Sequence, residues 1–402
     1  MKPEPPRPNP QKYWTLIAAG EPFRLLFPLG AAIGIFGVLL WPLFVWNVTS
    51  FYPGQIHARI MIEGFLTSFV IGFLGTALPR LLDVSRLKLF ESVGFAAALV
   101  AVTWLHVVGK MLWGDFVFLL TLVGLVVVLG TRFAKRRDLP PPSFVLVALG
   151  LGCALAGAAL LVVSQVALSS LPVWALATGR LLLFQGFILL PIMGIGAFLL
   201  PRFFDRPSRQ SFPESLSIPP GWKKEALFAL SCGVVVVVSF FLEAAGEIRW
   251  GMALRAGGVL VYFLREVPFH RVNRGSGSLA LGLRIALVSL PVGYGLTAVW
   301  PERMFSFLHL VFITGFGLLT FIVASRVVLG HSGQSRFFTA KLLSIRLLTV
   351  LLFLAMLTRV TADWFPTLRM SHYAYAAVAW IAGVLIWSAA FLPGMRKADV
   401  DA

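Results

Sequence analysis

Charged residues are scarce in this sequence. Asp, Glu, Lys and Arg make up 13% of its 402 residues, about half of the roughly 25% that is usual in a globular protein. Hydrophobic residues make up 58%, which is more apolar surface than a soluble chain of this length could bury. The composition therefore excludes a soluble globular protein and predicts a membrane protein with many spans.

Cysteine and acidic residues are also few. Cys153 and Cys232 are the two cysteines, and each lies in an apolar run, which excludes a disulfide framework and a CxxC metal or redox motif. The 17 acidic residues face 34 basic ones. The basic residues fall mainly in short gaps between apolar runs, so we expect them to orient the chain in the membrane. The predicted partner is therefore the lipid bilayer and not a nucleic acid.

A helix needs about 20 apolar residues to cross the hydrocarbon of a bilayer, and about twelve segments meet this length. They form one predicted membrane domain over residues 25–392, between tails at 1–24 and 393–402. The segments are Leu25–Trp46, Gly54–Pro79, Ser92–Gly109, Gly114–Phe133, Phe144–Val166, Trp174–Leu200, Ala226–Leu242, Trp250–Leu264, Leu279–Trp300, Met304–Leu329, Leu342–Thr361 and His372–Leu392. Most Lys and Arg residues lie in both tails and every second loop, which predicts that both termini are cytoplasmic.

A short motif recurs every four predicted spans. The second span contains Glu63-Gly64-Phe65, the sixth Gln185-Gly186-Phe187 and the tenth Thr314-Gly315-Phe316. This pattern suggests three four-helix units around a pseudo-threefold axis, since membrane folds are often built from repeats. The alternative is chance recurrence in helices that are rich in Gly and Phe.

Histidines offer candidate ligands. His57 and His309 open the second and tenth spans, and both spans run in the same direction, so the two rings lie at a similar depth. Two such imidazoles could ligate a haem iron from both sides; the alternative is a pair of interfacial, hydrogen-bonded residues. For His106 and His372 the interfacial interpretation is favoured.

Ionisable residues inside the predicted spans need partners, because an isolated charge in the membrane is costly. Arg59 and Glu63 are four residues apart and could pair on one helix face. Alternatively, Arg59 contacts a haem propionate and Glu63 belongs to a proton path. Arg180 in the sixth span lies at the level where the second and tenth spans carry His57 and His309. It could also contact a propionate, or its side chain could reach the interface.

Two stretches resemble the signatures of the NnrS family. The early signature, His-Ala-His-Glu-Met followed by Gly-Phe and Ala-x-Pro, corresponds to His57-Ala58-Arg59-Ile60-Met61, Gly64-Phe65 and Ala77-Leu78-Pro79. The late signature begins with His and ends Arg-x-x-Leu-Gly-His-x-Gly, which corresponds to His309 and the run from Arg326 to Gly333. His57, His309 and His331 match signature histidines, whereas Arg59 and Ile60 replace a His and a Glu.

The resemblance implies a haem-containing inner-membrane protein of bacteria that is linked to nitric oxide metabolism and to tolerance of nitrosative stress. It also raises copper as a second candidate cofactor. The replacements at Arg59 and Ile60 argue against copper and favour a single haem b, with His57 and His309 as axial ligands. His331 belongs to the opposite side of the membrane, so its role is open. An arrangement of three four-helix units with His on the second and tenth spans also resembles the catalytic subunit of haem-copper oxidases. The copper-binding histidines of that subunit are missing from this sequence.

Three functions remain open at this point. The first is a haem protein that handles nitric oxide or transfers electrons at the outer side of the membrane. The second is a secondary transporter without haem, in which Arg59, Glu63 and Arg180 line the substrate path. The third is a non-catalytic subunit of a respiratory complex or a homo-oligomer. The sequence does not decide whether the protein is an enzyme.

Overall fold

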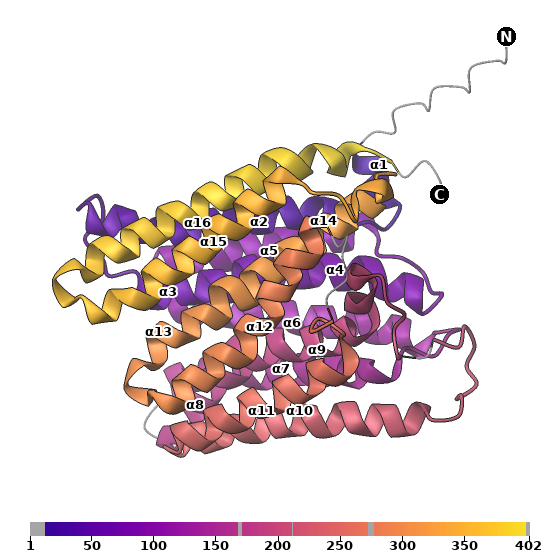
Figure 1. Ribbon diagram of the computed structural model, residues 1–402, viewed down its shortest axis with the longest axis horizontal. Coiled ribbons are helices and arrows are strands. Elements are labelled where there is room, and N and C mark those ends of the chain that lie inside the picture. The colour runs from indigo at the N-terminus through magenta and orange to yellow at the C-terminus, as the bar shows by residue number, and fades with distance from the viewer. Residues whose placement is uncertain (1–12, 168–170, 211, 272–276, 399–402) are drawn as a thin grey trace, which may run out of the picture.

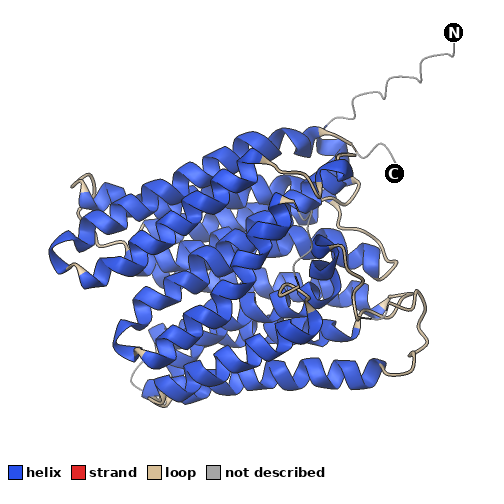
Figure 2. Cartoon of the chain, in the orientation of Figure 1, coloured by secondary structure: helices blue, strands red, loops and turns tan. Residues whose placement is uncertain are grey.

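The computed structural model describes residues 13–167, 171–210, 212–271 and 277–398. Within these ranges the chain is helical and contains no strand (Figures 1 and 2). Eleven helical segments are long and apolar enough to cross a membrane. They are Phe23–Val45, Gly54–Leu81, Leu89–Val107, Met111–Ala134, Pro142–Val166, Trp174–Phe204, Trp222–Ala244, Ser278–Val299, Pro301–Gly330, Leu343–Trp364 and Pro366–Arg396.

The eighth predicted span lies in a helix that is not among these eleven. It is α11, Ile248–Glu266, which has 19 residues and packs between α10 (Trp222–Ala244) and α12 (Ser278–Val299). Its sequence includes Arg249, Arg255 and Arg265, which lower its hydropathy. The described residues therefore form twelve long helical segments, as predicted, of which eleven have the composition of a membrane span.

Consecutive groups of four helices close into a ring. The last helix of each group packs against the first helix of the next: α6 (Met111–Ala134) on α7 (Val145–Val166), and α11 on α12. The final helix, α16 (Arg369–Phe391), packs against the first, α2 (Phe23–Val45). This cyclic order supports the predicted arrangement of three four-helix units.

The second helix of each unit has an unusual shared construction. In each, an α-helical start leads into a π-helical segment and then into a second α-helix. The three segments are α3–η1–α4 (Gly54–Arg59, Ile60–Leu66, Thr67–Leu81), α8–η4–α9 (Val173–Leu181, Leu182–Gly186, Phe187–Leu199) and α13–η7–α14 (Met304–His309, Leu310–Leu318, Leu319–Gly330). These three spans are the most buried of the eleven, so they form the centre of the bundle. Among the described residues, π-helical geometry occurs in these three places only.

A glycine in each π-segment lets the first helix of the same unit approach closely. A Cβ on Gly64 would lie 2.6 Å from Ile33 of α2, and a Cβ on Gly315 would lie 2.5 Å from Leu290 of α12. At Gly186 the corresponding neighbour is Cys153 of α7, at 3.1 Å. Small residues are favoured at helix contacts in membranes because they allow such approach. The Gly-Phe repeat in the sequence therefore marks equivalent packing positions.

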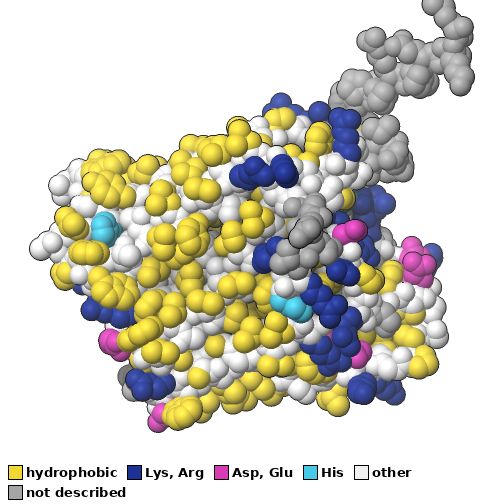
Figure 3. All heavy atoms as spheres, viewed as in Figure 1, with side chains coloured by type: hydrophobic (Ala, Val, Ile, Leu, Met, Phe, Trp, Pro, Cys, Tyr) yellow, Lys and Arg dark blue, Asp and Glu magenta, His cyan; other side chains and the backbone are white. Residues whose placement is uncertain are grey.

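The first and last described segments of the chain, α1 (Tyr13–Ala18) and η11 (Leu392–Arg396), lie at the same end of the bundle (Figure 1). Within the predicted N-terminal tail, α1 buries Leu16 and Ile17. Arg24 is also buried, and it donates hydrogen bonds to the carbonyl oxygens of Met395, Lys397 and His331 at 2.6, 2.8 and 2.9 Å. Lys and Arg side chains gather around this end of the surface, while apolar side chains cover its middle (Figure 3).

Glu21 carries the negative charge of this end cluster. It forms ion pairs with Arg24 at 2.5 Å and with Arg80 at 2.6 Å, and it accepts a hydrogen bond from Nδ1 of His331 at 2.8 Å. Burial alone would raise the pKa of Glu21, but the hydrogen bond from His331 and the charge of Arg24 outweigh it and hold the pKa at about 2. The signature residue His331 thus joins the last turn of α14 to the N-terminal segment.

This pKa predicts a stability contribution that depends on pH. Because the pKa of Glu21 is lowered from 4.5 to about 2, the ionised form stabilises the fold fully above about pH 4.5, and this contribution is lost as the pH falls to about 2. The shift corresponds to about 3 kcal/mol. In Glu21→Gln this acid-dependent loss should be absent, and the variant should be less stable at neutral pH. Unfolding of the purified protein in detergent as a function of pH measures both effects, and equal pH profiles for the two proteins would contradict the prediction.

Candidate functional site

His57 and His309 present the same nitrogen atom. Nδ1 of His57 lies 3.0 Å from the carbonyl oxygen of Gly37, and Nδ1 of His309 lies 2.5 Å from that of Phe305. A carbonyl can only accept, so each Nδ1 carries the proton and donates it. Each Nε2 is then a lone-pair donor without a hydrogen-bond partner among the described residues. A metal-binding histidine commonly has this arrangement, in which the second ring nitrogen donates to a carbonyl and fixes the ring.

The two histidines share surroundings. Both rings are half-buried, although they lie on two of the three central helices, the second and tenth spans. His309 lies within electrostatic range of His57, and the guanidinium of Arg359 lies within range of both. The ring of Trp41 packs on His57 with 5.9 Å between centroids and on Tyr373 with 4.8 Å, and Arg359 lies over Tyr373 at 4.2 Å. The structure therefore brings the two predicted ligands into one neighbourhood.

Positive charge is in excess beside these histidines. Arg359, from α15 (Leu343–Thr361), and Arg369 share one carboxylate, that of Asp363, at 4.0 and 3.3 Å. Asp363 also accepts a hydrogen bond from Ser306. The Nη1 atom of Arg359 is buried and makes no hydrogen bond within the described chain. A buried donor without an acceptor is costly, so this guanidinium suits an anionic ligand such as a propionate. Sequence reasoning missed Arg359, although an arginine inside a predicted span was the available signal.

Arg59 points away from this neighbourhood. It forms a two-pronged ion pair with Asp115 of α6, in which Nε and Nη2 lie 2.8 and 3.0 Å from the two carboxylate oxygens. Residues two apart on a helix do not face each other, so Arg59 and His57 lie on different sides of α3. The propionate contact predicted for Arg59 thus competes with a buried partner that is already in place.

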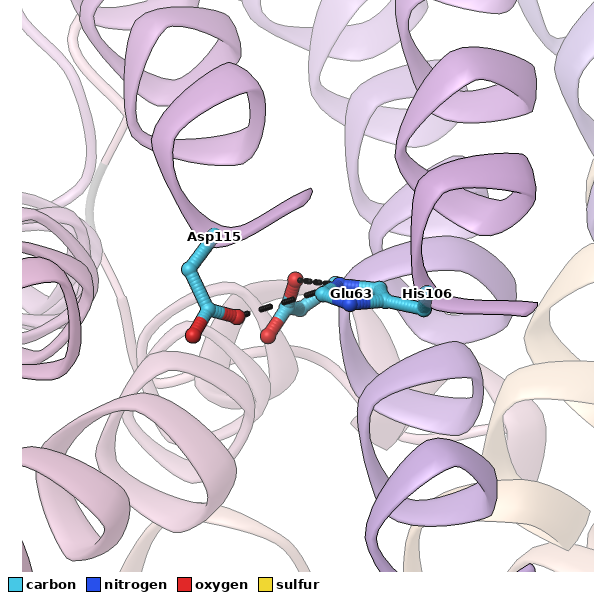
Figure 4. A group of neighbouring side chains, drawn as sticks. All are labelled: Glu63, His106 and Asp115. Carbon is cyan, nitrogen blue, oxygen red and sulfur yellow. Dashed lines mark hydrogen bonds and ion pairs between the residues drawn. The ribbon is translucent and has the colours of Figure 1, made fainter. Parts of the chain in front are cut away.

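The expected ion pair between Arg59 and Glu63 is replaced by two other contacts. Arg59 pairs with Asp115, and Oε2 of Glu63 lies within hydrogen-bond distance of Nε2 of His106, at 2.8 Å (Figure 4). The physical reason lies in the backbone. The i, i+4 rule holds for an α-helix, but the π-helix begins at Ile60, and its wider turn rotates Glu63 away from Arg59.

Five side chains from four helical spans build a polar cluster around Glu63. It consists of Arg59 and Glu63 from the second span, His106 at the end of α5 (Leu89–Val107), Asp115 at the start of α6, and Gln165 at the end of α7, whose amide lies 2.6 Å from Asp115. Glu63 and His106 are 0% exposed and Asp115 is 1% exposed. His106, expected at the membrane interface, is instead fully enclosed by protein. Asp115 was missed by sequence reasoning, although it is the one acid in its predicted span.

Arg180 lies beside this cluster rather than in it. It is exposed and within electrostatic range of Arg59 and Asp115. It makes no hydrogen bond or ion pair within the described chain, which leaves its guanidinium free for a ligand or the membrane interface. His331, at the far end of the tenth span from His309, belongs to the Glu21 cluster. His57 and His309 are thus together, Arg59 and Arg180 lie in and beside the Glu63 cluster, and His331 lies at the opposite end of the bundle.

An apolar cavity of about 360 Å³ lies among the three central helices on the side of His331. Phe69 of α4, Ile192 of α9 and Val323 of α14 line it, with Arg202, Arg326 and His331 also present in its wall. Arg59, Glu63 and Arg180 do not line this cavity. The residues proposed for a transport path therefore do not face this internal space.

Fold and composition define a multi-pass, all-helical membrane protein that carries buried charged side chains. A family model described as NnrS protein matches residues 18–398, nearly the whole chain. The protein therefore belongs to the NnrS family. A search of curated proteins finds no match.

The Arg59–Asp115 ion pair should be important for stability. Asp115→Asn removes the charge that balances a buried guanidinium, which typically costs about 3–5 kcal/mol. We expect a large drop in the thermal unfolding midpoint in detergent. Asp83→Asn is the matched control, because Asp83 and its partner Arg137 are 62% and 79% exposed, and exposed pairs contribute about 0–1 kcal/mol. Similar small effects in both variants would contradict the prediction.

Proposed function

We propose that this protein binds one haem b through His57 and His309 at one end of its central helices. The observation that carries the proposal is the matched state of the two rings: each donates Nδ1–H to a backbone carbonyl and leaves Nε2 available. The mutual proximity of the two side chains and the half-buried setting add support. Neutral imidazole is a usual axial ligand of haem iron.

The surrounding charges fit the same ligand. Arg359 has a buried nitrogen without a hydrogen-bond acceptor, and it and Arg369 are balanced by a single carboxylate. We propose Arg359 as the main contact for haem propionates. Arg180 remains a candidate for a second contact, because its guanidinium is free, whereas Arg59 is committed to Asp115.

The proposed physiological role follows from family membership together with this ligand set. A haem iron held by two imidazoles supplies one-electron transfer, whereas an iron with one imidazole has an open position for a gas ligand. We therefore propose electron transfer or nitric oxide handling in the inner membrane of a bacterium, with both termini cytoplasmic. The concentration of Lys and Arg at the end where α1 and η11 lie supports this orientation (Figure 3).

Absorption spectroscopy of the purified, full-length protein tests the haem proposal. We expect a reduced-minus-oxidised spectrum of the b type, and loss of most of it in His57→Ala and in His309→Ala. The matched control is His270→Ala, because His270 is exposed and belongs to neither helix; its spectrum should be unchanged. A colourless wild-type protein would contradict the proposal and favour a transporter. Co-purification of stoichiometric subunits with colourless protein would favour a non-catalytic subunit of a complex.

Arg359 should tune the haem as well as hold it. A positive charge near the iron disfavours the oxidised, more positive state, so Arg359→Gln should lower the midpoint potential. Redox titration of the haem band measures this shift. Arg346→Gln, a substitution on the same helix α15, is the control, since Arg346 has no electrostatic contact with either histidine. An unchanged potential in Arg359→Gln would exclude this residue as a propionate partner.

A further inference from the structure

The polar cluster around Glu63 contains more negative than positive charge. Its buried members are two carboxylates, Glu63 and Asp115, and one guanidinium, Arg59. Asp115 and Arg59 neutralise each other through two hydrogen bonds. Glu63 is left with His106 as its direct partner. If His106 were neutral and Glu63 ionised, the cluster would hold one uncompensated negative charge inside the membrane domain.

An uncompensated buried charge is strongly disfavoured in a low-dielectric interior, where a group takes up or releases a proton instead. Among the residues that the structure describes, no other cation is positioned to balance Glu63. The helices packed against η1 are α2, α3, α4 and α5, and their further charged residues, such as Arg24 of α2 and Glu91 of α5, lie at the opposite end of the bundle. Arg180 is exposed and makes no direct contact with Glu63, so solvent screens its charge.

A second buried cluster in the same fold shows balanced charges. At the equivalent position of the sixth span stands Gln185, which accepts a hydrogen bond from Arg255 at 2.8 Å. Arg255 is fully buried and pairs with Glu243 at 2.7 Å. One guanidinium there meets one carboxylate, and the central-helix residue is a neutral amide. The first unit has an acid at this position and therefore lacks one positive charge.

Two atoms of the Glu63–His106 pair have no partner. Oε1 of Glu63 and Nδ1 of His106 are buried and make no hydrogen bond within the described chain. Gly114 leaves the space that the His106 ring occupies. A Cβ at this position would lie 2.4 Å from Cε1 and 2.6 Å from Nδ1 of the ring. The absence of a side chain at Gly114 thus gives the ring the space it needs to reach Glu63.

We propose that Glu63 and His106 form a proton-binding site. Together the two side chains hold one proton more than an ionised Glu63 beside a neutral His106 would hold. Proton uptake converts the Glu63 carboxylate to a carboxylic acid that donates to Nε2 of neutral His106. No bond other than O–H forms, and no electron is transferred. The bound proton cancels the excess charge of the cluster, whereas a divalent metal ion would leave it positive. Asp115, which would be the third ligand of such an ion, is already engaged by Arg59 and Gln165.

Infrared spectroscopy of the full-length protein in lipid nanodiscs tests the proposal, supported by NMR of protein labelled with ¹⁵N-histidine. At neutral pH the wild type should show a carboxylic-acid C=O band that disappears in Glu63→Gln. Glu243→Gln is the matched control and should leave the band unchanged, because the Glu243 carboxylate already has a buried cation, Arg255, as its partner. If the proton resides on the imidazole instead, the labelled spectrum should contain an imidazolium signal that is lost in His106→Gln, which would also support the site.

A second pair of variants tests the site without changing either titrating group. Gly114→Ala should displace the His106 ring and shift the carboxylic-acid band, whereas Gly130→Ala on the same helix should not, since no atom lies within 4 Å of a Cβ at Gly130. Absence of both the acid band and the imidazolium signal at neutral pH would overturn the proposal. A stoichiometric divalent metal that elemental analysis finds in the wild type and not in Glu63→Gln would overturn it as well. These outcomes do not depend on haem, because none of the variants alters His57 or His309.

Discussion

Compensation of buried charge is the constraint on which this structure depends. Water cannot solvate an ion in the core of a membrane bundle, so each buried charged side chain needs an opposite charge, a hydrogen bond or a proton. The described chain meets this requirement in separate clusters, around Asp115, around Glu243 and around Glu21. Where the balance is incomplete, at Glu63 and at Arg359, we propose that a proton completes it in one case and an anionic ligand in the other.

The three central helices give these clusters their positions. Each changes from α- to π-helical geometry at the same place in its unit, and π-segments are rare and often occur at functional sites. The extra residue in the turn changes which side chains share a face, so Glu63 faces His106 rather than Arg59. Hydroxyl groups help to satisfy the altered backbone: Thr67 donates to the carbonyl of Ile62 at 2.7 Å. The π-helical segment of the second span therefore determines which side chains meet in the polar cluster.

Much of the fold could be predicted from the sequence, because span length and hydropathy are local properties. All twelve predicted segments correspond to helices, and the Gly-Phe repeat marks three equivalent central helices. The proximity of His57 and His309 was also accessible, since helices that run in parallel place corresponding residues at one level.

The partners of the charged residues were not accessible in the same way. Asp115, Arg359 and Gln165 come from helices distant in sequence, and only packing shows which of them meet. The Arg59–Glu63 pair was predicted with a rule for α-helices, and no residue pattern announced the π-segment that breaks it. The role of His331 depended on Glu21, which lies in a stretch that hydropathy assigned to a tail.

The position of Arg24 has a consequence for biosynthesis. Its guanidinium belongs to α2, yet two of the carbonyls that accept its hydrogen bonds are at Met395 and Lys397, 371 and 373 residues further along the chain. The α2 helix therefore cannot reach its fully hydrogen-bonded state until those two residues have been synthesised. Closure of the ring of helices waits for this late contact, and truncation before Met395 would leave the buried guanidinium without these two acceptors.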